Sequence, residues 1–218
     1  RQGVKRAIAH FLSGRNLGGG VAWLGVLCNN QYGYGYSSSL QGDFQLSNPQ
    51  PVWDVVVVSH EIGHNFDSPH THCYGGIGGN ANPVDACYGA EGDAGCWAGG
   101  ESLPGLNSLT GGVPGSGKGT LMSYCHLLGG GMANIALTFG QNHSYGVAAS
   151  RVSTAMSNYV AQTASSSPSC ITVANTQSYL LTVGKTGSGT VTSNPAGINC
   201  GSDCTETYPA GEIGRAHV

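Results

Sequence analysis

The sequence predicts an α+β fold. Residues 52–66 follow a helical apolar pattern, and residues 144–163 predict a second helix with a looser apolar stripe. Residues 17–28 form a glycine-led apolar run typical of a strand, and residues 178–197 alternate around a Gly-Ser-Gly turn like a hairpin. A chain of 218 residues holds one or two domains and is long enough to bury a core.

In the segment 52–66 (VWDVVVVSHEIGHNF), residue propensity and residue spacing predict different structures. Its four consecutive valines favour a strand. Val55, Val58 and Ile62 nevertheless recur at the spacing of one helical face, and the histidines fall on a different face. Because tertiary context often overrides the preference of β-branched residues, we expect a helix.

Irregular segments separate these elements. Residues 29–50 predict a loop that could hold one short strand, and residues 73–118 are Gly-rich without periodicity. A loop as long as the second is usually functional or held by cross-links. Residues 166–175 predict a linker. We therefore expect a catalytic domain over residues 1–165 and a short all-β module over residues 176–211.

Composition excludes several classes of protein. Only 9% of residues are charged and the formal net charge is -3, so no nucleic-acid partner is expected. No apolar run approaches the roughly 20 residues of a transmembrane helix. Eight cysteines without a CxxC pair predict disulfides, and hence a secreted or cell-surface protein, over a cytosolic metal cluster.

His60, Glu61 and His64 form an HExxH motif. Histidines at positions i and i+4 of a helix lie one above the other, so both imidazoles can reach one ion. Glu61 is placed beside them to accept a proton, not to bind the metal. After a chain reversal, His70 can supply a third nitrogen. Three protein ligands leave the open position that a catalytic zinc needs.

The segment HEIGHNFDSPH resembles the metzincin signature HExxHxxGxxH, and residues 119–126 (GTLMSYCH) resemble the Met-turn of that family. Residues 9–28 are similar to the strand region before the active-site helix of reprolysin-like (adamalysin-type) members, particularly bacterial ones. The resemblance covers roughly residues 7–170. It implies a metzincin-like zincin domain in which Zn2+ is bound by His60, His64 and His70, Glu61 is the general base, and Met122 forms a hydrophobic floor beneath the metal.

The resemblance also suggests how substrate binds. A protein or peptide would lie as an extended strand antiparallel to the segment around residues 21–27. Tyr124 matches the tyrosine that astacin- and serralysin-like metzincins place near the zinc. An ordinary packed tyrosine is an equally good interpretation of Tyr124.

Three residues depart from the family pattern. Asp67 stands where the family has a glycine that turns the chain in a left-handed conformation; Asp tolerates that conformation at some cost. Thr71 replaces the Asp that follows the third histidine in animal reprolysins. His72 lies close enough in sequence to compete with His70 as the third ligand, although the spacing favours His70.

The cysteine pairing is assigned partly from the resemblance. It implies a bond from Cys28, near the substrate strand, to Cys170, after the last helix. Cys73 and Cys125 flank the metal site and could join its loop to the Met-turn. The remaining expected pairs are Cys87 with Cys96 and Cys200 with Cys204.

The two ends carry separate expectations. Only 59 residues precede His60, so we expect that upstream strands and helices of the family fold are missing. Residues 178–211 resemble the opening of a bacterial surface repeat of the internalin B-repeat type, which implies a bacterial source and contact with a cell surface or matrix. Residues 212–218 (EIGRAHV) match the translation of a common sequencing adapter, and we expect a non-native tail there.

The predicted function is a secreted zinc endopeptidase that hydrolyses peptide bonds with a zinc-activated water. The first alternative is a catalytically inactive metzincin-like adhesion protein, and the intact Glu61 argues against it. The second is a thermolysin-like site with Glu91 or Glu101 as a distant ligand, which His70 and Met122 oppose. Structural Ca2+ is also considered, but no motif supports it.

Overall fold

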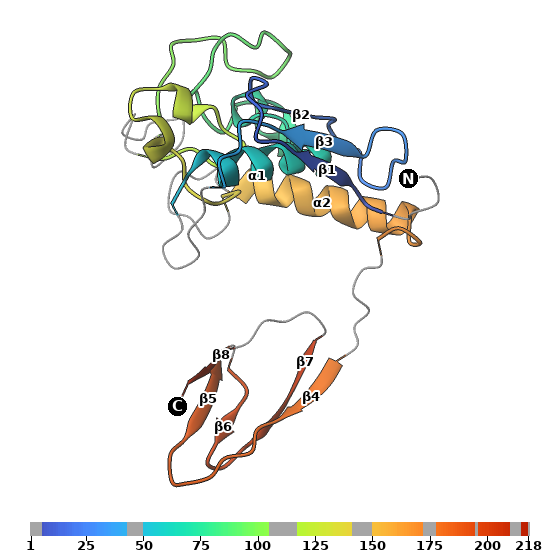
Figure 1. The fold of residues 1–218 in the computed structure, drawn as a ribbon, viewed down its shortest axis with the longest axis vertical. Helices are drawn as coiled ribbons and strands as arrows, with labels where there is room; N and C mark the ends of the chain where they lie inside the picture. Colours follow the sequence, from blue (N-terminus) through green and yellow to red (C-terminus); the bar gives the residue numbers. More distant parts are fainter. Residues whose placement is uncertain are drawn as a thin grey trace. The chain divides into compact units, whose positions relative to one another are not determined.

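A computed structural model describes most of the chain. The described residues are 6–42, 50–104, 117–140, 150–171, 178–194, 196–209 and 215–217. The chain divides into two compact units, Arg1–Ile171 and Thr172–Val218 (Figure 1). Each unit is described by itself.

The first unit contains a small mixed sheet. Its strands are β1 (Ala9–Leu12), β2 (Gly20–Ala22) and β3 (Tyr34–Ser37), in the order β1-β3-β2. β1 runs parallel to the central β3, and β2 runs antiparallel to it. β3 is the single short strand expected within residues 29–50. β2 pairs with β3 alone among the described strands, so its other side is an edge.

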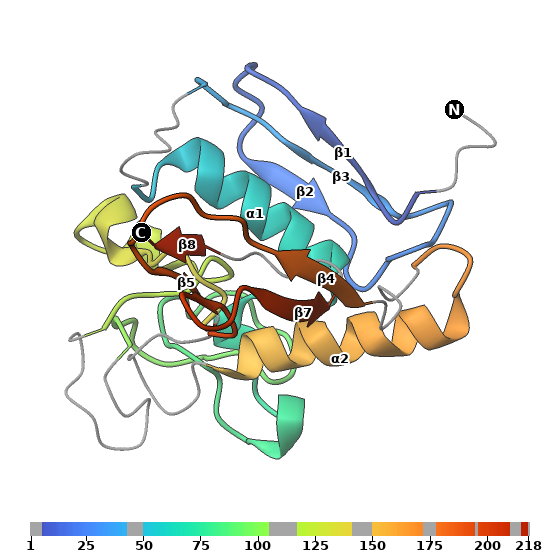
Figure 2. The same cartoon turned by 90° about the horizontal axis from the view of Figure 1, so that it is seen from below.

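The helix expected from the HExxH segment is α1 (Trp53–Asn65). It lies along the sheet, with the long helix α2 on its other side (Figure 2). The face of α1 that is most buried is not the expected one. Val55, Val58 and Ile62, which were expected to face the core, are only partly buried. Val56 is buried instead, in a core with Cys87, Leu121, Cys125 and Ile135. The face that carries the histidines therefore packs against the segment around residues 121–125.

The strand expected over residues 17–28 is shorter than predicted, since β2 ends at Ala22. Gly25 (φ 64°) and Cys28 (φ 65°) have left-handed conformations that a strand cannot contain. The Gly25 and Val26 N–H groups donate to the carbonyls of His64 (2.9 Å) and Asn65 (3.2 Å). This segment thus satisfies carbonyl groups at the end of α1, which otherwise lack partners.

Asp67 turns the chain after α1, as its position in the motif predicts. Its φ is 66°, in the left-handed region. The Asp67 N–H donates to the His64 carbonyl (2.9 Å), and the Ser68 N–H donates to the Gly63 carbonyl (3.2 Å). Such bonds close a helix C-terminus. The reversal returns the chain toward α1 and brings His70 beside it.

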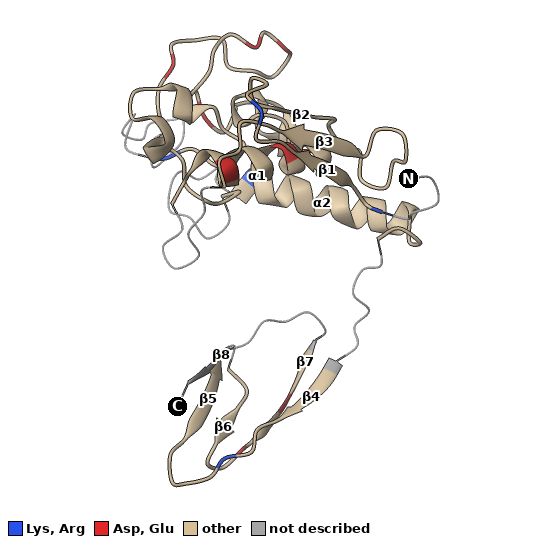
Figure 3. Cartoon of the chain, in the orientation of Figure 1, with Lys and Arg blue, Asp and Glu red and all other residues tan. Residues whose placement is uncertain are grey.

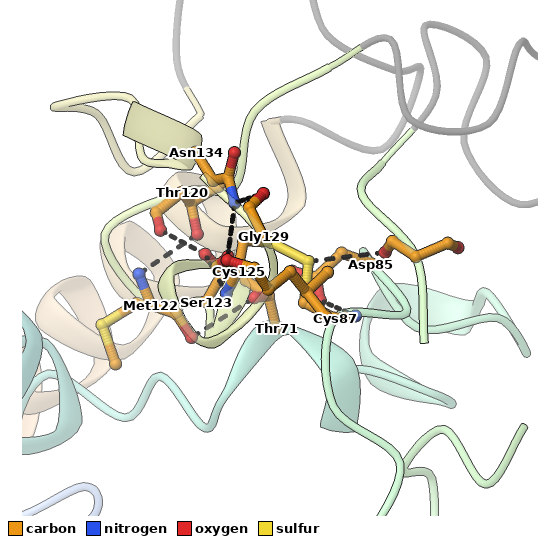
Figure 4. The surroundings of a disulfide bond; sticks show 11 residues. Thr71, Asp85, Cys87, Thr120, Met122, Ser123, Cys125, Gly129 and Asn134 are labelled. Atoms are coloured by element: carbon orange, nitrogen blue, oxygen red, sulfur yellow. Dashed lines mark hydrogen bonds between the residues drawn. A yellow bond between two sulfur atoms is a disulfide. The ribbon is translucent and has the colours of Figure 1, made fainter. Parts of the chain in front are cut away.

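Two of the expected disulfides are wrong. The structure contains Cys28–Cys170 and Cys200–Cys204, as expected, but it pairs Cys73 with Cys96 and Cys87 with Cys125. The expected pairs Cys73–Cys125 and Cys87–Cys96 do not form. Cys87 and Cys125 are both buried in the core beside α1 (Figure 4).

Backbone hydrogen bonds explain why Cys73 pairs with Cys96. The Gly75 N–H donates to the Gly95 carbonyl (2.9 Å), and the Trp97 N–H donates to the His72 carbonyl (2.7 Å). These bonds lie on either side of Cys73 and Cys96 and hold the two cysteines together. The long loop is therefore cross-linked, as its length predicted, but in a different pattern.

The second helix of the first unit is α2 (Ser150–Ser166). It was expected over residues 144–163, of which residues 144–149, including Val147, lie outside the described part of the chain. Val152 of α2 is fully buried with Tyr74, Val84 and Met122. The described part of this unit also contains four short helices, η1 (Thr71–Cys73), η2 (Ile77–Gly79), η4 (Cys125–Leu127) and η5 (Gly131–Asn134).

The second unit contains two small sheets in its described part. β4 (Ser178–Thr182) pairs antiparallel with β7 (Thr205–Pro209), and β5 (Val191–Asn194) lies between β6 (Asn199–Cys200) and β8 (Arg215–His217). The hairpin expected over residues 178–197 is therefore wrong, because β4 and β5 do not pair. The Val183 N–H donates to the Cys204 carbonyl (2.9 Å) and extends the β4–β7 ladder by one residue beyond Thr182.

The expected tail, residues 212–218, lies partly in β8; residues 212–214 and 218 are outside the described part. Its non-native origin stays a prediction. None of the helices described combines the length and apolar character that a bilayer crossing requires. The Lys and Arg residues of the described chain are spread apart (Figure 3).

Candidate metal centre

Three imidazole rings come together at the end of α1. His60 and His64 project from the helix, and His70 comes from the chain after the Asp67 turn. The ring centroids are 4.7 Å apart for His60 and His64, 5.1 Å for His60 and His70, and 4.8 Å for His64 and His70. One nitrogen from each ring lies within 4.8 Å of the others, so the three could hold one metal ion.

Each ring also makes one hydrogen bond through its Nδ1 atom. The His60 Nδ1 lies 2.8 Å from the Leu121 carbonyl, the His64 Nδ1 lies 2.8 Å from the Ser68 carbonyl, and the His70 Nδ1 lies 2.7 Å from Glu91 Oε2. These oxygens accept, so each Nδ1 carries the proton. The lone pair of each neutral ring is then on Nε2, which is the form that binds a metal.

Burial keeps these rings neutral. It lowers the pKa of His60 well below its usual value and lowers the pKa of His64. For His70, burial and the neighbouring His64 and His72 lower the pKa to about 3. Because metal ligands must be deprotonated, the three residues fit a divalent ion without first losing a proton.

Glu61 lies beside this cluster with only 6% of its surface exposed. Its carboxyl group packs against Gly20 of β2, where an added Cβ would lie 2.5 Å from Glu61 Oε1. Burial raises the pKa of Glu61 to about 7. A carboxyl group with such a pKa can accept and return a proton near neutral pH.

The segment around Met122 lies under α1. It is hydrogen-bonded both to the helix and to the chain segment that carries His70. Leu121 provides the carbonyl that binds the His60 ring, and the Met122 carbonyl accepts the Thr71 N–H (3.0 Å). Met122 is fully buried, and an added Cβ at Gly63 would collide with its sulfur atom. Gly63 of the HExxH motif is thus the residue that allows Met122 to approach the helix.

Tyr124 lies over the histidines. Its ring centroid is 4.2 Å from that of His70 and 5.8 Å from that of His60. Burial, followed by the carboxylates of Glu91 and Glu61, raises the pKa of Tyr124 to about 12. Its hydroxyl therefore keeps its proton at neutral pH and can donate a hydrogen bond.

A pocket of about 470 Å³ opens beside Glu61. Much of its wall is apolar, and its lining comprises Gly18, Gly19, Gly20, Trp53, Val56, Val57, His60, Glu61, Tyr124, His126 and Leu127. Trp53 and His126 were not singled out from the sequence. They reach the pocket because the start of α1 and the segment after Tyr124 meet there, and no local motif encodes that contact.

His70, His72 and Glu91 lie close together, and His70 is shared by two groups of possible metal ligands, one with His60 and His64 and one with His72 and Glu91. His70 joins His60 and His64, whereas the His72 Nε2 lies 2.6 Å from Glu91 Oε2. The same carboxylate oxygen binds the His70 Nδ1. Glu91 thus contacts the His70 ring at Nδ1, the nitrogen opposite the one that would face His60 and His64. Sequence spacing could not reveal this contact, since a cross-linked loop creates it.

The chain matches one family in comparisons with known proteins. The reprolysin-type model of Metallo-peptidase family M12 matches residues 1–126, more than half of the chain. No curated protein and no solved structure matches it. The matched region contains the three histidines, Glu61, Met122 and Tyr124. M12 metallopeptidases use zinc, in agreement with a histidine cluster that could bind a metal. The chain therefore belongs to metallopeptidase family M12.

Proposed function

We propose that the chain is a secreted zinc-dependent endopeptidase of the metzincin type. One observation carries the proposal: three Nε2 atoms of neutral imidazoles face a common point, and a buried carboxyl group with a pKa near 7 lies beside them. Three ligands and an adjacent base are what a catalytic zinc site requires.

His60, His64 and His70 would bind the zinc through Nε2, with Met122 as a hydrophobic floor. When bound, zinc would polarise the scissile carbonyl and lower the pKa of water toward ~7. Glu61 accepts the proton of the attacking water and returns it to the leaving amine. Tyr124, whose raised pKa keeps it protonated, donates a hydrogen bond to the developing oxyanion.

The substrate would be an extended peptide paired with the free edge of β2. Gly20 of that strand contacts Glu61, so a peptide on this edge would bring its backbone close to the base. The pocket beside Glu61 would receive one side chain. Its walls of Trp53, Val57 and Leu127 favour an apolar side chain.

The proposed location is outside the cell. Four disulfides in the described chain are compatible with an oxidising compartment. A bacterial source and a surface or matrix contact through the second unit remain proposals that rest on the repeat-like sequence of residues 178–211. We assign no calcium site.

Replacing the base tests the proposed chemistry. Glu61→Gln should retain stoichiometric zinc and lose about 10²–10⁴-fold in the rate of casein cleavage, because the proton acceptor is gone but the ligands remain. Glu101→Gln, which removes the same charge from a more distant loop, should cleave at the unchanged rate. Cleavage that survives both a chelator and Glu61→Gln would refute the mechanism and favour an inactive adhesion protein with a contaminating activity.

A further inference from the structure

The third histidine of the cluster is held differently from the first two. His60 and His64 lie on a helix, and backbone carbonyls bind their Nδ1 atoms. His70 lies outside the helix, and a side chain, the Glu91 carboxylate, binds its Nδ1 at 2.7 Å. The orientation of the His70 ring therefore depends on Glu91 more than the other rings depend on any single side chain.

The acidic residue that the family resemblance predicts as a partner of the third histidine is absent. The resemblance places an acidic residue at position 71, directly after the third histidine, where this chain has Thr71. Thr71 is fully buried, and its hydroxyl donates to the Met122 carbonyl (3.3 Å). A carboxylate from a distant part of the sequence, Glu91, contacts His70 instead.

A second histidine fixes Glu91 in turn. The His72 Nε2 donates to Glu91 Oε2 at 2.6 Å, and the His72 side chain has no exposed surface. The His70 and His72 rings are stacked, with centroids 5.3 Å apart and planes 13° from parallel. One carboxylate oxygen thus accepts from two parallel rings, a geometry that restricts where Glu91 can lie.

Disulfides hold the loop that carries Glu91 on both sides. Cys87 is bonded to Cys125, in the segment beneath α1, and Cys96 is bonded to Cys73, next to His72. Glu91 lies between these anchors, so little further ordering is needed to bring its carboxylate to His70. Its side chain is only 27% exposed.

We propose that Glu91 is a positioning residue for the third metal ligand, and that His72 positions Glu91. The inference rests on the proposed zinc site. A carboxylate on the second nitrogen of a ligating imidazole fixes the tautomer and ring direction and makes the first nitrogen a stronger donor. Removing such a partner typically weakens metal binding by about 10–100-fold.

The test measures zinc affinity of the full chain by competition with a chromophoric chelator. Glu91→Gln and Glu91→Ala should bind zinc about 10–100-fold more weakly than the unsubstituted protein, and Glu91→Asp should recover part of the loss. His72→Gln, which keeps a donor, should bind more tightly than His72→Ala. Glu101→Gln, with the same loss of charge in the same loop, should bind as the unsubstituted protein does.

A second measurement separates positioning from general stability. The metal-free Glu91→Gln protein should unfold at the same temperature as the metal-free unsubstituted protein, and only the zinc-bound forms should differ. Unchanged zinc affinity in Glu91→Gln and Glu91→Ala would overturn the inference. Zinc retained by His70→Ala but lost in Glu91→Ala would also overturn it, since Glu91 would then be a ligand. Failure of the unsubstituted chain to bind zinc would instead refute the proposed function.

Discussion

At the scale of single residues, the candidate site depends on small groups that permit close contacts. Gly63 lies inside the HExxH motif, on the side of α1 that faces Met122. Gly20 lies where β2 meets the Glu61 side chain. Neither glycine could be assigned a packing role from the sequence, because the atoms that require its missing side chain come from distant segments. The motif predicts the candidate ligands, whereas the structure shows which glycines allow Met122 and β2 to pack close to α1.

Gly63→Ala should therefore disturb the packing of Met122 against α1, next to the histidine cluster. The added Cβ would collide with the Met122 sulfur in a fully buried position, and overpacking of this kind costs about 1–3 kcal/mol. We expect a lower midpoint in denaturant unfolding and weaker zinc binding. Gly100→Ala is the matched control, because an added Cβ there meets no atom within 4 Å. Equal stability of the two variants would contradict the proposed contact.

At the scale of elements, some features follow from local sequence and others do not. α1 could be predicted because its apolar spacing and its motif agree with a helix. Asp67 could be predicted in a left-handed conformation because it stands where the family motif has a glycine, and Asp is among the few residues that tolerate that conformation. The early end of β2, the β4–β7 pairing and two of the disulfides could not be predicted. Each depends on contacts between segments far apart in the chain, which carry no local signal.

The loop that follows η1 illustrates how a single side chain can organise an element. Arg151 of α2 donates to the carbonyls of Tyr74 (2.5 Å) and Ile77 (2.8 Å) through one nitrogen and to Asn82 (2.7 Å) through the other. The guanidinium thus binds carbonyl groups from three positions of the loop that follows η1. Hydrogen bonds to a charged group contribute about 1.5–3 kcal/mol when a partner is removed.

Arg151→Ala should lower the denaturant midpoint and expose residues 74–82 to proteolysis, because the carbonyl groups of this loop lose a charged donor that joins them to α2. Arg151→Lys should recover only part of the stability, since an ammonium group lacks the planar fork that reaches several carbonyls. Arg15→Ala, an exposed position, is the control for loss of charge. Rapid cleavage of the loop in the Arg15 variant, or unchanged resistance in the Arg151 variant, would show that the guanidinium does not hold the loop.

At the scale of the whole molecule, the candidate site belongs to one unit. All residues of the cluster, its base and its pocket precede Ile171, and Cys28–Cys170 closes that unit. The second unit has its own strands and its own disulfide, Cys200–Cys204. Zinc should therefore stabilise the first unit alone.

Metal removal tests this division. A ligand that binds only the folded state stabilises it by RT ln(1 + [L]/Kd), or about 2.7 kcal/mol at a hundredfold excess over Kd. In calorimetry, zinc added to the chelator-treated chain should raise the unfolding temperature of the transition that belongs to the first unit and leave any transition of the second unit unmoved. A chain ending at Ile171 should show the same zinc-dependent rise. If that shorter chain loses zinc affinity while remaining folded, residues 172–218 contribute to the centre, and the assignment of the site to one unit is wrong.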